Sequence, residues 1–266
     1  IARNIENGTR FILAQHGGNY FQHKFHFHTN YEVDISDIYL SWGKISKKNV
    51  IPFGIIKNLK KNKDNYDKSK KIILEVRMRK AYNREIKLDS GFIESKKYLK
   101  NLCDFFYSIK KKNFSKNLYV KLHPTKSFWN EKKMFLSYNK DLKFLDEKKE
   151  MIKEMNSAKL IIHTFCATGH LECISIDKPT LILFVHDLNL LNDKKKKYFI
   201  IFKKLGIMHF SSESLIKKLQ KIDSEENLFN WWNDKNLQNI LNKYRNDYCF
   251  INKERNYSLT KIINEK

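Results

Sequence analysis

Short apolar runs alternate with amphipathic segments along this chain. Six runs rich in Ile, Leu, Val and Phe are candidate strands: FILA (11–14), IYLSW (38–42), KIILEV (71–76), LYVKL (118–122), KLIIHT (159–164) and TLILF (180–184). Strands that alternate with helical segments are typical of βα units around a parallel sheet. The pattern therefore predicts an α/β fold with a Rossmann-like parallel sheet.

The segments between these runs have helical spacing. Residues 92–109 carry apolar side chains every three or four positions, which is the stripe of an amphipathic helix. Further helices are expected over about 147–157, 168–176, 194–205, 211–222 and 232–247. The lysine- and asparagine-rich stretch at 57–70 is the best candidate for a loop or domain boundary.

The 266 residues are 41% hydrophobic, enough for a buried core, and carry a formal net charge of +23. Such a charge favours nucleic acid, an anionic membrane surface or a phosphate-bearing substrate as partner. Lysine, asparagine and isoleucine are abundant throughout the chain, however, so a general compositional bias also explains the charge. No helix-turn-helix, RRM or zinc-finger spacing occurs, which argues against nucleic acid and leaves an anionic lipid surface open.

The cysteine pattern indicates the cellular compartment of the protein. Cys103, Cys166, Cys173 and Cys249 are scattered, without a CxxC pair, and lie in or beside apolar stretches. Reduced and mostly buried thiols are expected, and with them a cytoplasmic protein, either free or peripheral at the inner face of the cell membrane. The chain opens without methionine on a polar segment that runs at once into a strand, so we expect the C-terminal part of a longer polypeptide.

Chemically interesting residues follow three of the predicted strands. QHGG comes after the first strand, HPTKS after the fourth and TFCATGHLE after the fifth. Ligands of open parallel sheets bind at the carboxyl ends of the strands. These segments are therefore the candidate site.

His123 and Pro124 end the fourth strand. The histidine can donate a hydrogen bond to a phosphate, and the proline stops the strand. Thr125, Lys126 and Ser127 offer further donors. A turn histidine that only caps the strand is the alternative.

The segment HTFCATGHLE has small and hydroxyl residues between a strand and a helix. Thr164, Thr168 and Gly169 form the predicted turn, and the free amides of the helix would receive an anion. Glu172, expected in the first turn of that helix, could accept hydrogen bonds from ribose hydroxyls. The alternative is an ordinary capped helix with a glutamate favoured by its dipole.

QHGGNY has three interpretations. His16 can be a general base or a phosphate donor, with Gly17 and Gly18 allowing a close approach of the backbone to a ligand. A purely structural glycine turn is the second. A transition-metal site is the third, but no acidic or cysteine ligand shares the histidine spacing, so no metal is predicted on His16, His23, His26 and His28.

Several of these segments together resemble a family of surface-carbohydrate transferases of GT-B architecture. The resemblance is carried by FILAQHGGNY, YEVDISDIYLSWGK, IPFG, SAKLIIHTFCATGHLECISIDKPTLIL and the late KLGIMHF with WW, along nearly the whole chain. The HP element and the threonine turn also resemble, more distantly, those of bacterial polysialyltransferases, capsular Kdo transferases and CDP-glycerol glycerophosphotransferases.

The resemblance implies a role for each matching residue. His16 and His123 would face the cleft as catalytic residues, the turn of Thr164 and Thr168 would hold the phosphate of a cytidine nucleotide, and Glu172 would occupy the acidic position of the donor site. The family tends to have an arginine-based segment where this chain has KLHP. The resemblance therefore leaves open which residues contact the phosphate.

The resemblance also implies a domain arrangement and an activity. Residues 1–50 would be a remnant of the acceptor domain, 51–225 the donor-binding half of a GT-B-type fold, and 226–266 helices that pack back. The expected enzyme transfers a sugar from a nucleotide-sugar donor to a glycan or lipid-linked acceptor at the cell surface, without metal or cofactor. A CDP-polyol phosphotransferase, or a non-catalytic basic protein that binds acidic lipid or glycan intermediates, are the alternatives.

Overall fold

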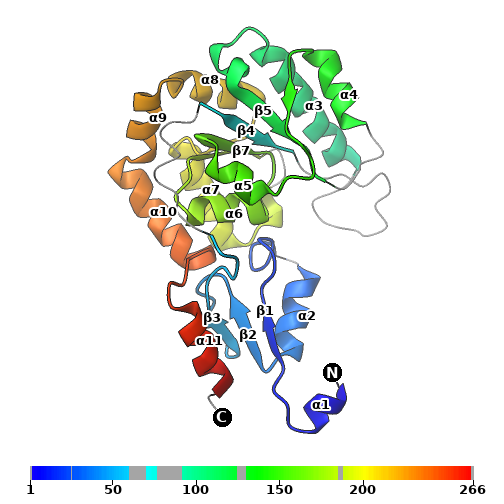
Figure 1. Ribbon diagram of the computed structural model, residues 1–266, viewed down its shortest axis with the longest axis vertical. Helices are drawn as coiled ribbons and strands as arrows, with labels where there is room; N and C mark the ends of the chain where they lie inside the picture. Colours follow the sequence, from blue (N-terminus) through cyan, green and yellow to red (C-terminus); the bar gives the residue numbers. More distant parts are fainter. Residues whose placement is uncertain are drawn as a thin grey trace.

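The computed structural model describes residues 2–24, 26–59, 70–76, 92–124, 130–184 and 188–264. It has two parallel sheets, a larger and a smaller one, which lie one above the other in Figure 1. The smaller sheet has the order β1-β2-β3, with strands β1 (Ile12–Ala14), β2 (Ile38–Ser41) and β3 (Val50–Pro52). We call it, with the helices that cover it, the small unit.

The larger sheet is doubly wound. Its strands are β4 (Ile72–Glu75), β5 (Leu118–Lys121), β6 (Lys143–Phe144), β7 (Leu160–His163), β8 (Thr180–Leu183) and β9 (Met208–His209). They are all parallel, in the order β6-β5-β4-β7-β8-β9, so the direction of winding reverses between β4 and β7. The predicted Rossmann-like sheet is confirmed. We call this sheet and its helices the large unit.

Eleven α-helices and two 3₁₀ helices lie in the described part of the chain. The α-helices are α1 (Ala2–Glu6), α2 (Phe27–Ile35), α3 (Phe92–Ile109), α4 (Glu131–Tyr138), α5 (Met151–Asn156), α6 (Thr168–Ser175), α7 (Asp193–Lys204), α8 (Ser212–Lys221), α9 (Glu225–Trp232), α10 (Lys235–Tyr248) and α11 (Arg255–Asn264). The 3₁₀ helices are η1 (Asn113–Asn117) and η2 (Leu188–Leu190). None of these helices is long and apolar enough to cross a membrane.

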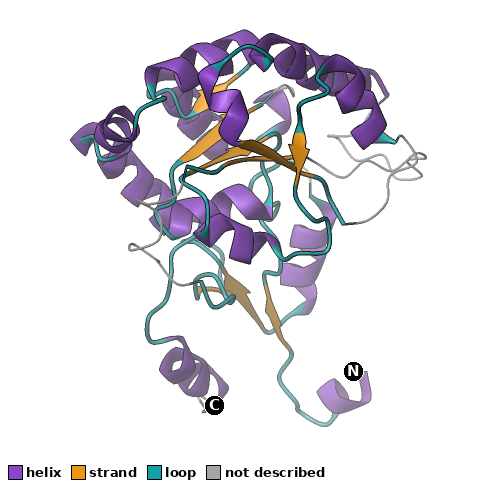
Figure 2. Ribbon diagram, turned by 45° about the horizontal axis from the view of Figure 1, so that its top comes forward, coloured by secondary structure: helices purple, strands orange, loops and turns teal. Residues whose placement is uncertain are grey.

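Helices cover both faces of the large sheet (Figure 2). On one face Leu74 packs with Phe106 of α3 and Leu215 of α8, and on the other Ile182 packs with Phe202 of α7. Since neither face meets water, β7 and β8 are buried at every position. This is why their sequences are continuous apolar runs.

The predicted elements differ from the observed ones mainly where an element is short or capped. The helix expected over 232–247 is α10, which begins at Lys235 because Asp234 caps it by accepting a hydrogen bond from the Leu237 amide (2.9 Å). Helix α9, which precedes it, was not predicted. The lysine- and asparagine-rich stretch expected to be a loop or boundary comes between β3 and β4 in the sequence, and its residues 60–69 are outside the described residues. The assignment of the two units to acceptor and donor stays a prediction.

The C-terminal helices join the two units. Helix α10 packs on α6 of the large unit, and α11 lies beside β3 of the small unit (Figure 1). There Ile262 of α11 packs on Leu40 and Phe53. The opposite face of the small sheet is covered by α2, where Val33 packs on Tyr39.

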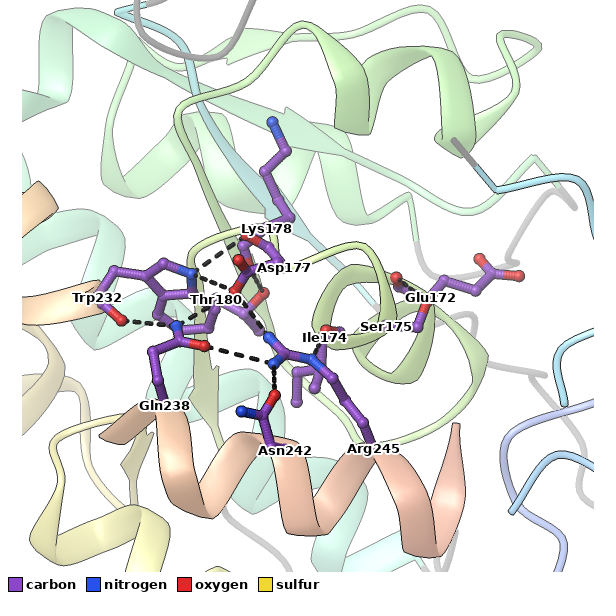
Figure 3. Close-up of polar contacts among 10 residues, drawn as sticks. All are labelled: Glu172, Ile174, Ser175, Asp177, Lys178, Thr180, Trp232, Gln238, Asn242 and Arg245. Carbon is purple, nitrogen blue, oxygen red and sulfur yellow. Dashed lines mark hydrogen bonds and ion pairs between the residues drawn. The ribbon is translucent and has the colours of Figure 1, made fainter. Parts of the chain in front are cut away.

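Arg245 holds α10 against the end of α6 (Figure 3). Its Nε donates to the carbonyl of Ile174 and its Nη2 to Oδ1 of Asp177, both at 2.7 Å. Trp232 and Gln238 donate to the same carboxylate oxygen at 3.1 and 3.2 Å. The Asp177 charge is therefore held by a cation and two neutral donors, which fixes the register of α10 on the large unit.

Two glycines let the backbones of the two units touch. A Cβ on Gly18 would lie 2.4 Å from the carbonyl oxygen of Ala167, and one on Gly43 would lie 2.1 Å from that of Asp247. Neither glycine has a positive φ, so glycine is needed at these positions only because a side chain would not fit. Any side chain at these two positions would push the small unit away from α6 or α10.

This contact gives a first prediction. Gly18→Ala places a methyl group against backbone that cannot move aside, so we expect the free energy of unfolding to fall by about 1–3 kcal/mol. Gly17→Ala is the matched control, because its nearest contact would be an ordinary 3.6 Å from Thr168 Oγ1. Denaturant unfolding of both variants measures the effect. Equal stability of the two variants would contradict the close contact.

Candidate functional site

A glutamate and a histidine meet where the winding of the large sheet reverses. Glu75 is the last residue of β4 and His163 the last residue of β7, the adjacent strand. The His163 Nδ1 lies 2.5 Å from Oε2 of Glu75. The imidazole side chain is 1% exposed and the carboxylate 17% exposed, so the carboxylate is the part that solvent or a ligand reaches.

Gly169 makes room for this carboxylate. A Cβ on Gly169 would lie 2.6 Å from Oε2 of Glu75. The carboxylate thus lies against the first turn of α6. Sequence reasoning missed Glu75 and His163, although each is the last or nearly the last residue of a predicted strand.

His123 lies at the same edge of the sheet. It follows β5, which pairs with β4, and β4 pairs with β7. Desolvation lowers the pKa of His123, and the negative charge of Glu75 opposes that shift. The structure thus brings His123 and the 164–169 turn to one edge, while their shared binding of a phosphate stays a prediction. The other predicted donors of this segment, Lys126 and Ser127, lie outside the described residues.

The two threonines of the turn have different surroundings. Thr164 is fully buried, its hydroxyl donates to the carbonyl of Glu75 (2.9 Å), and it lies 2.6 Å from the Tyr98 hydroxyl. Its hydroxyl therefore holds the strand ends together. Thr168 is only partly buried, and its Oγ1 accepts from the amide of Gly18 (3.0 Å). Its own hydrogen has no acceptor among the described residues.

Glu172 does not lie where the sequence suggested. Helix α6 begins at Thr168, so Glu172 is in the second turn and not the first. Its carboxylate is buried and accepts from the Lys57 ammonium at 2.6 Å. Burial raises the pKa of Glu172, and Lys57 opposes the shift. In this structure Glu172 is therefore ion-paired with Lys57, and its contact with a ribose hydroxyl stays a prediction. The glutamate side chain that lies against the first turn is that of Glu75.

His16 belongs to a chain of hydrogen bonds in the small unit. The Tyr20 hydroxyl donates to Oε1 of Glu32 (2.7 Å) and lies 3.0 Å from Nδ1 of His16. Because the hydroxyl hydrogen goes to Glu32, His16 is the donor in the second bond. The hydroxyl lies within hydrogen-bond distance of both ring nitrogens, 3.0 Å from Nδ1 and 3.2 Å from Nε2, so one nitrogen of a neutral ring donates to it and the other keeps a lone pair. The side chain is 73% exposed.

The loop of His16 rests on the first turn of α6. Gly17 and Gly18 lie between His16 and the contact with Ala167 and Thr168. The close approach predicted for these glycines is thus made to α6, and a contact with a ligand stays a prediction. As for a metal, no cluster of three or more His, Cys, Asp or Glu side chains suited to hold an ion occurs among the described residues.

Two backbone amides in the first turn of α6 have no acceptor among the described residues. Ala167 is its N-cap residue and makes no side-chain cap hydrogen bond. Within the described residues nothing accepts from the amides of Thr168 and Gly169, which an α-helix leaves without an internal partner. Together with the helix dipole, such amides favour a phosphate or another anion.

Behind α6 lies a buried lysine. Lys195 of α7 is fully buried and donates to the Tyr244 hydroxyl, which lies 3.1 Å from Nε2 of His170 in α6. The rings of Tyr244 and Tyr248 surround the ammonium at 4.3 and 4.5 Å from their centroids. Burial lowers the pKa of Lys195 to about 7. Nothing in the sequence distinguishes Lys195 from its neighbours, since it stands in a run of four lysines.

The two units together define a fold. A doubly wound parallel sheet faces a second parallel α/β unit, and both are joined by C-terminal helices that pack back, which is the GT-B architecture. The MurG structure from Acinetobacter baumannii is similar to this chain with a TM-score of 0.54 and 12% identity, over 98% of this chain and 68% of MurG.

The family follows from the sequence. Residues 1–263 match the LIC12162 family transferase description, so the chain belongs to that family of transferases. A UDP complex of MnaA from S. aureus is a more distant structural match, with a TM-score of 0.44 and 12% identity over 87% of this chain and 64% of MnaA. No curated protein sequence matches the chain.

The buried lysine gives a second prediction. Its pKa is about 7 in the folded chain and 10.5 ordinarily, so between these values the unfolded chain holds a proton that the folded chain has lost. Stability therefore rises with pH in this window. From pH 7 to 9 we expect the wild type to gain about 1–2 kcal/mol relative to Lys195→Met. Urea unfolding of both proteins at several pH values measures this, and a difference that does not change with pH would refute it.

Proposed function

We propose that this protein is a glycosyltransferase that moves a sugar from a nucleotide-activated donor, with a cytidine nucleotide as first candidate, to a surface glycan. One observation carries the proposal. The loop that presents His16 is hydrogen-bonded through Gly18 to Thr168, in the first turn of α6, at 3.0 Å. A candidate base and a candidate phosphate site, from different units, thus lie next to each other.

In this proposal the donor phosphate binds at the first turn of α6. The amides of Thr168 and Gly169 and the hydroxyl hydrogen of Thr168 are the donors, and His123 adds a hydrogen bond from the end of β5. Donors that are already in place stabilise the charge that develops on the leaving phosphate. They can do so without a metal, which is part of the proposal.

Glu75 takes over the role that the sequence suggested for Glu172. Its carboxylate lies against Gly169 and is held by His163. A carboxylate fixed in this way can accept from a sugar or ribose hydroxyl beside the phosphate, where it would orient the donor. The hydrogen bond from His163 also weakens the repulsion between the Glu75 carboxylate and the phosphate.

His16 acts on the acceptor. The ring nitrogen that carries no proton takes the proton of the acceptor hydroxyl, the acceptor oxygen forms a bond to the anomeric carbon, and the bond from that carbon to the phosphate oxygen breaks. The electron pair of that bond leaves with the phosphate. Tyr20 and Glu32 are positioning residues, because the Tyr20 hydroxyl, which donates to Glu32, accepts from the His16 ring and so holds it in place.

Nucleotide binding tests the proposal most simply. A ligand that binds only the folded protein raises its melting temperature. We expect CMP or CDP to raise it more than UDP or GDP in a thermal-shift screen. A basic protein without a nucleotide site would show no difference among the four, and that result would overturn the proposal.

The division of roles gives a further prediction. His16→Ala should lower the transfer rate by about 10²–10⁴-fold, the usual effect of a proton-transfer group, and leave nucleotide affinity unchanged. His123→Ala should weaken nucleotide binding by roughly 1.5–3 kcal/mol through the loss of a hydrogen bond to a charged phosphate. Calorimetric titration and turnover of both variants separate the two effects. Equal loss of nucleotide affinity in both would contradict the division.

Tyr20→Phe tests the positioning chain. The ring stays, but the hydroxyl that links His16 to Glu32 is lost. We expect a lower rate at saturating substrates with unchanged nucleotide affinity, and a changed dependence of the rate on pH. A rate and a pH profile equal to those of the wild type would show that the hydroxyl has only a structural role.

A further inference from the structure

A cavity lies between the two units, apart from the first turn of α6. Its volume is about 460 Å³. The small unit contributes the segment between β1 and α2, with Lys24 and His26, and the loop after β2, with Lys44 and Lys47. The opposite wall is Lys194 at the start of α7 and Tyr248 at the end of α10. None of the residues that the proposed function places at the donor lines it.

The charge in this cavity is unbalanced. Of its four lysines, Lys194 pairs with the one carboxylate among the described lining residues, that of Asp247, at 2.9 Å. Lys24, Lys44 and Lys47 are exposed and have no carboxylate partner within the described residues. These three ammonium groups therefore give the wall of the cavity a net positive charge, which attracts an anion.

The cavity also adjoins the His16 chain. The His26 ring in its wall lies 5.0 Å, centroid to centroid, from the ring of Tyr20, which lies 4.9 Å from the ring of His16. Apolar surface from Phe21, Ile45 and Tyr248 lines the same space. A ligand in the cavity can thus pack a sugar ring on apolar side chains while its anionic group meets the lysines.

We propose that this cavity binds an anionic group, a phosphate or a carboxylate, of the acceptor glycan, and so places an acceptor hydroxyl at His16. The assignment to an acceptor rests on the proposed function, whereas the binding of an anion does not. Lysine suits such a group because its ammonium has three donors on a flexible stem. The acceptor class that follows is a phosphorylated or acidic glycan, in preference to a neutral one.

Two probes separate the possible anions. Inorganic pyrophosphate represents a phosphate-bearing acceptor, and glucuronate represents an acidic sugar. Each is titrated into the wild-type protein by calorimetry at low ionic strength. The site variant has Lys24→Gln, Lys44→Gln and Lys47→Gln together. The control variant has Lys96→Gln, Lys97→Gln and Lys100→Gln, which removes the same charge from the exposed face of α3.

We expect at least one probe to bind the wild type, and the site variant to bind it about tenfold or more weakly, as expected for the loss of hydrogen bonds to a charged group. The control variant should bind as the wild type does. If pyrophosphate binds more tightly, the anionic group of the acceptor is a phosphate. If glucuronate binds more tightly, it is a carboxylate. Binding of neither probe, or an equal loss in both variants, would overturn the site.

The nucleotide screen keeps this test separate from the proposed function. The site variant retains the α6 turn and His123, so its thermal shift with nucleotide should equal that of the wild type. An anion site without any nucleotide shift would refute the proposed function and leave the anion site standing. A nucleotide-induced thermal shift without binding of either anion would refute the anion site and leave the proposed function standing.

Discussion

The contact of backbone with backbone at Gly18 and Gly43 is the constraint on which the arrangement of this molecule depends. Hydrogen atoms in place of side chains let the loop after β1 rest on the first turn of α6, and the loop after β2 rest on the end of α10. The first contact brings His16 to the edge of the large sheet where the winding reverses. The second closes the wall of the interdomain cavity beside Asp247. Both candidate binding regions therefore depend on how closely these two units approach.

The sequence predicted those parts of the fold whose physical cause is local. Strands β7 and β8 are buried on both faces, so their apolar runs could be found without the structure. Strands β6 and β9 have two residues each, too few for any periodicity to show. The start of α10 at Lys235 depends on Asp234 as its N-cap, which a helical stripe does not reveal.

The site was predictable only in part, because its key pairs depend on the strand order. Glu75 and His163 are 88 positions apart and meet because β4 and β7 are neighbours. Glu172 was predicted as a ligand residue, but its ion pair with Lys57, 115 positions away, could not be seen in the sequence. His16 was recognisable from its place between a strand and two glycines, but its partners Tyr20 and Glu32 come from α2 and the loop before it.

The central claim is that the nucleotide phosphate binds at the first turn of α6, opposite His16. A crystal structure of the protein with the nucleotide that gives the largest thermal shift tests it most directly. The account predicts phosphate oxygens within hydrogen-bond distance of the Thr168 and Gly169 amides, with His16 facing the sugar side of that phosphate. A phosphate bound at another edge of the sheet, or in the lysine-lined cavity, would contradict it.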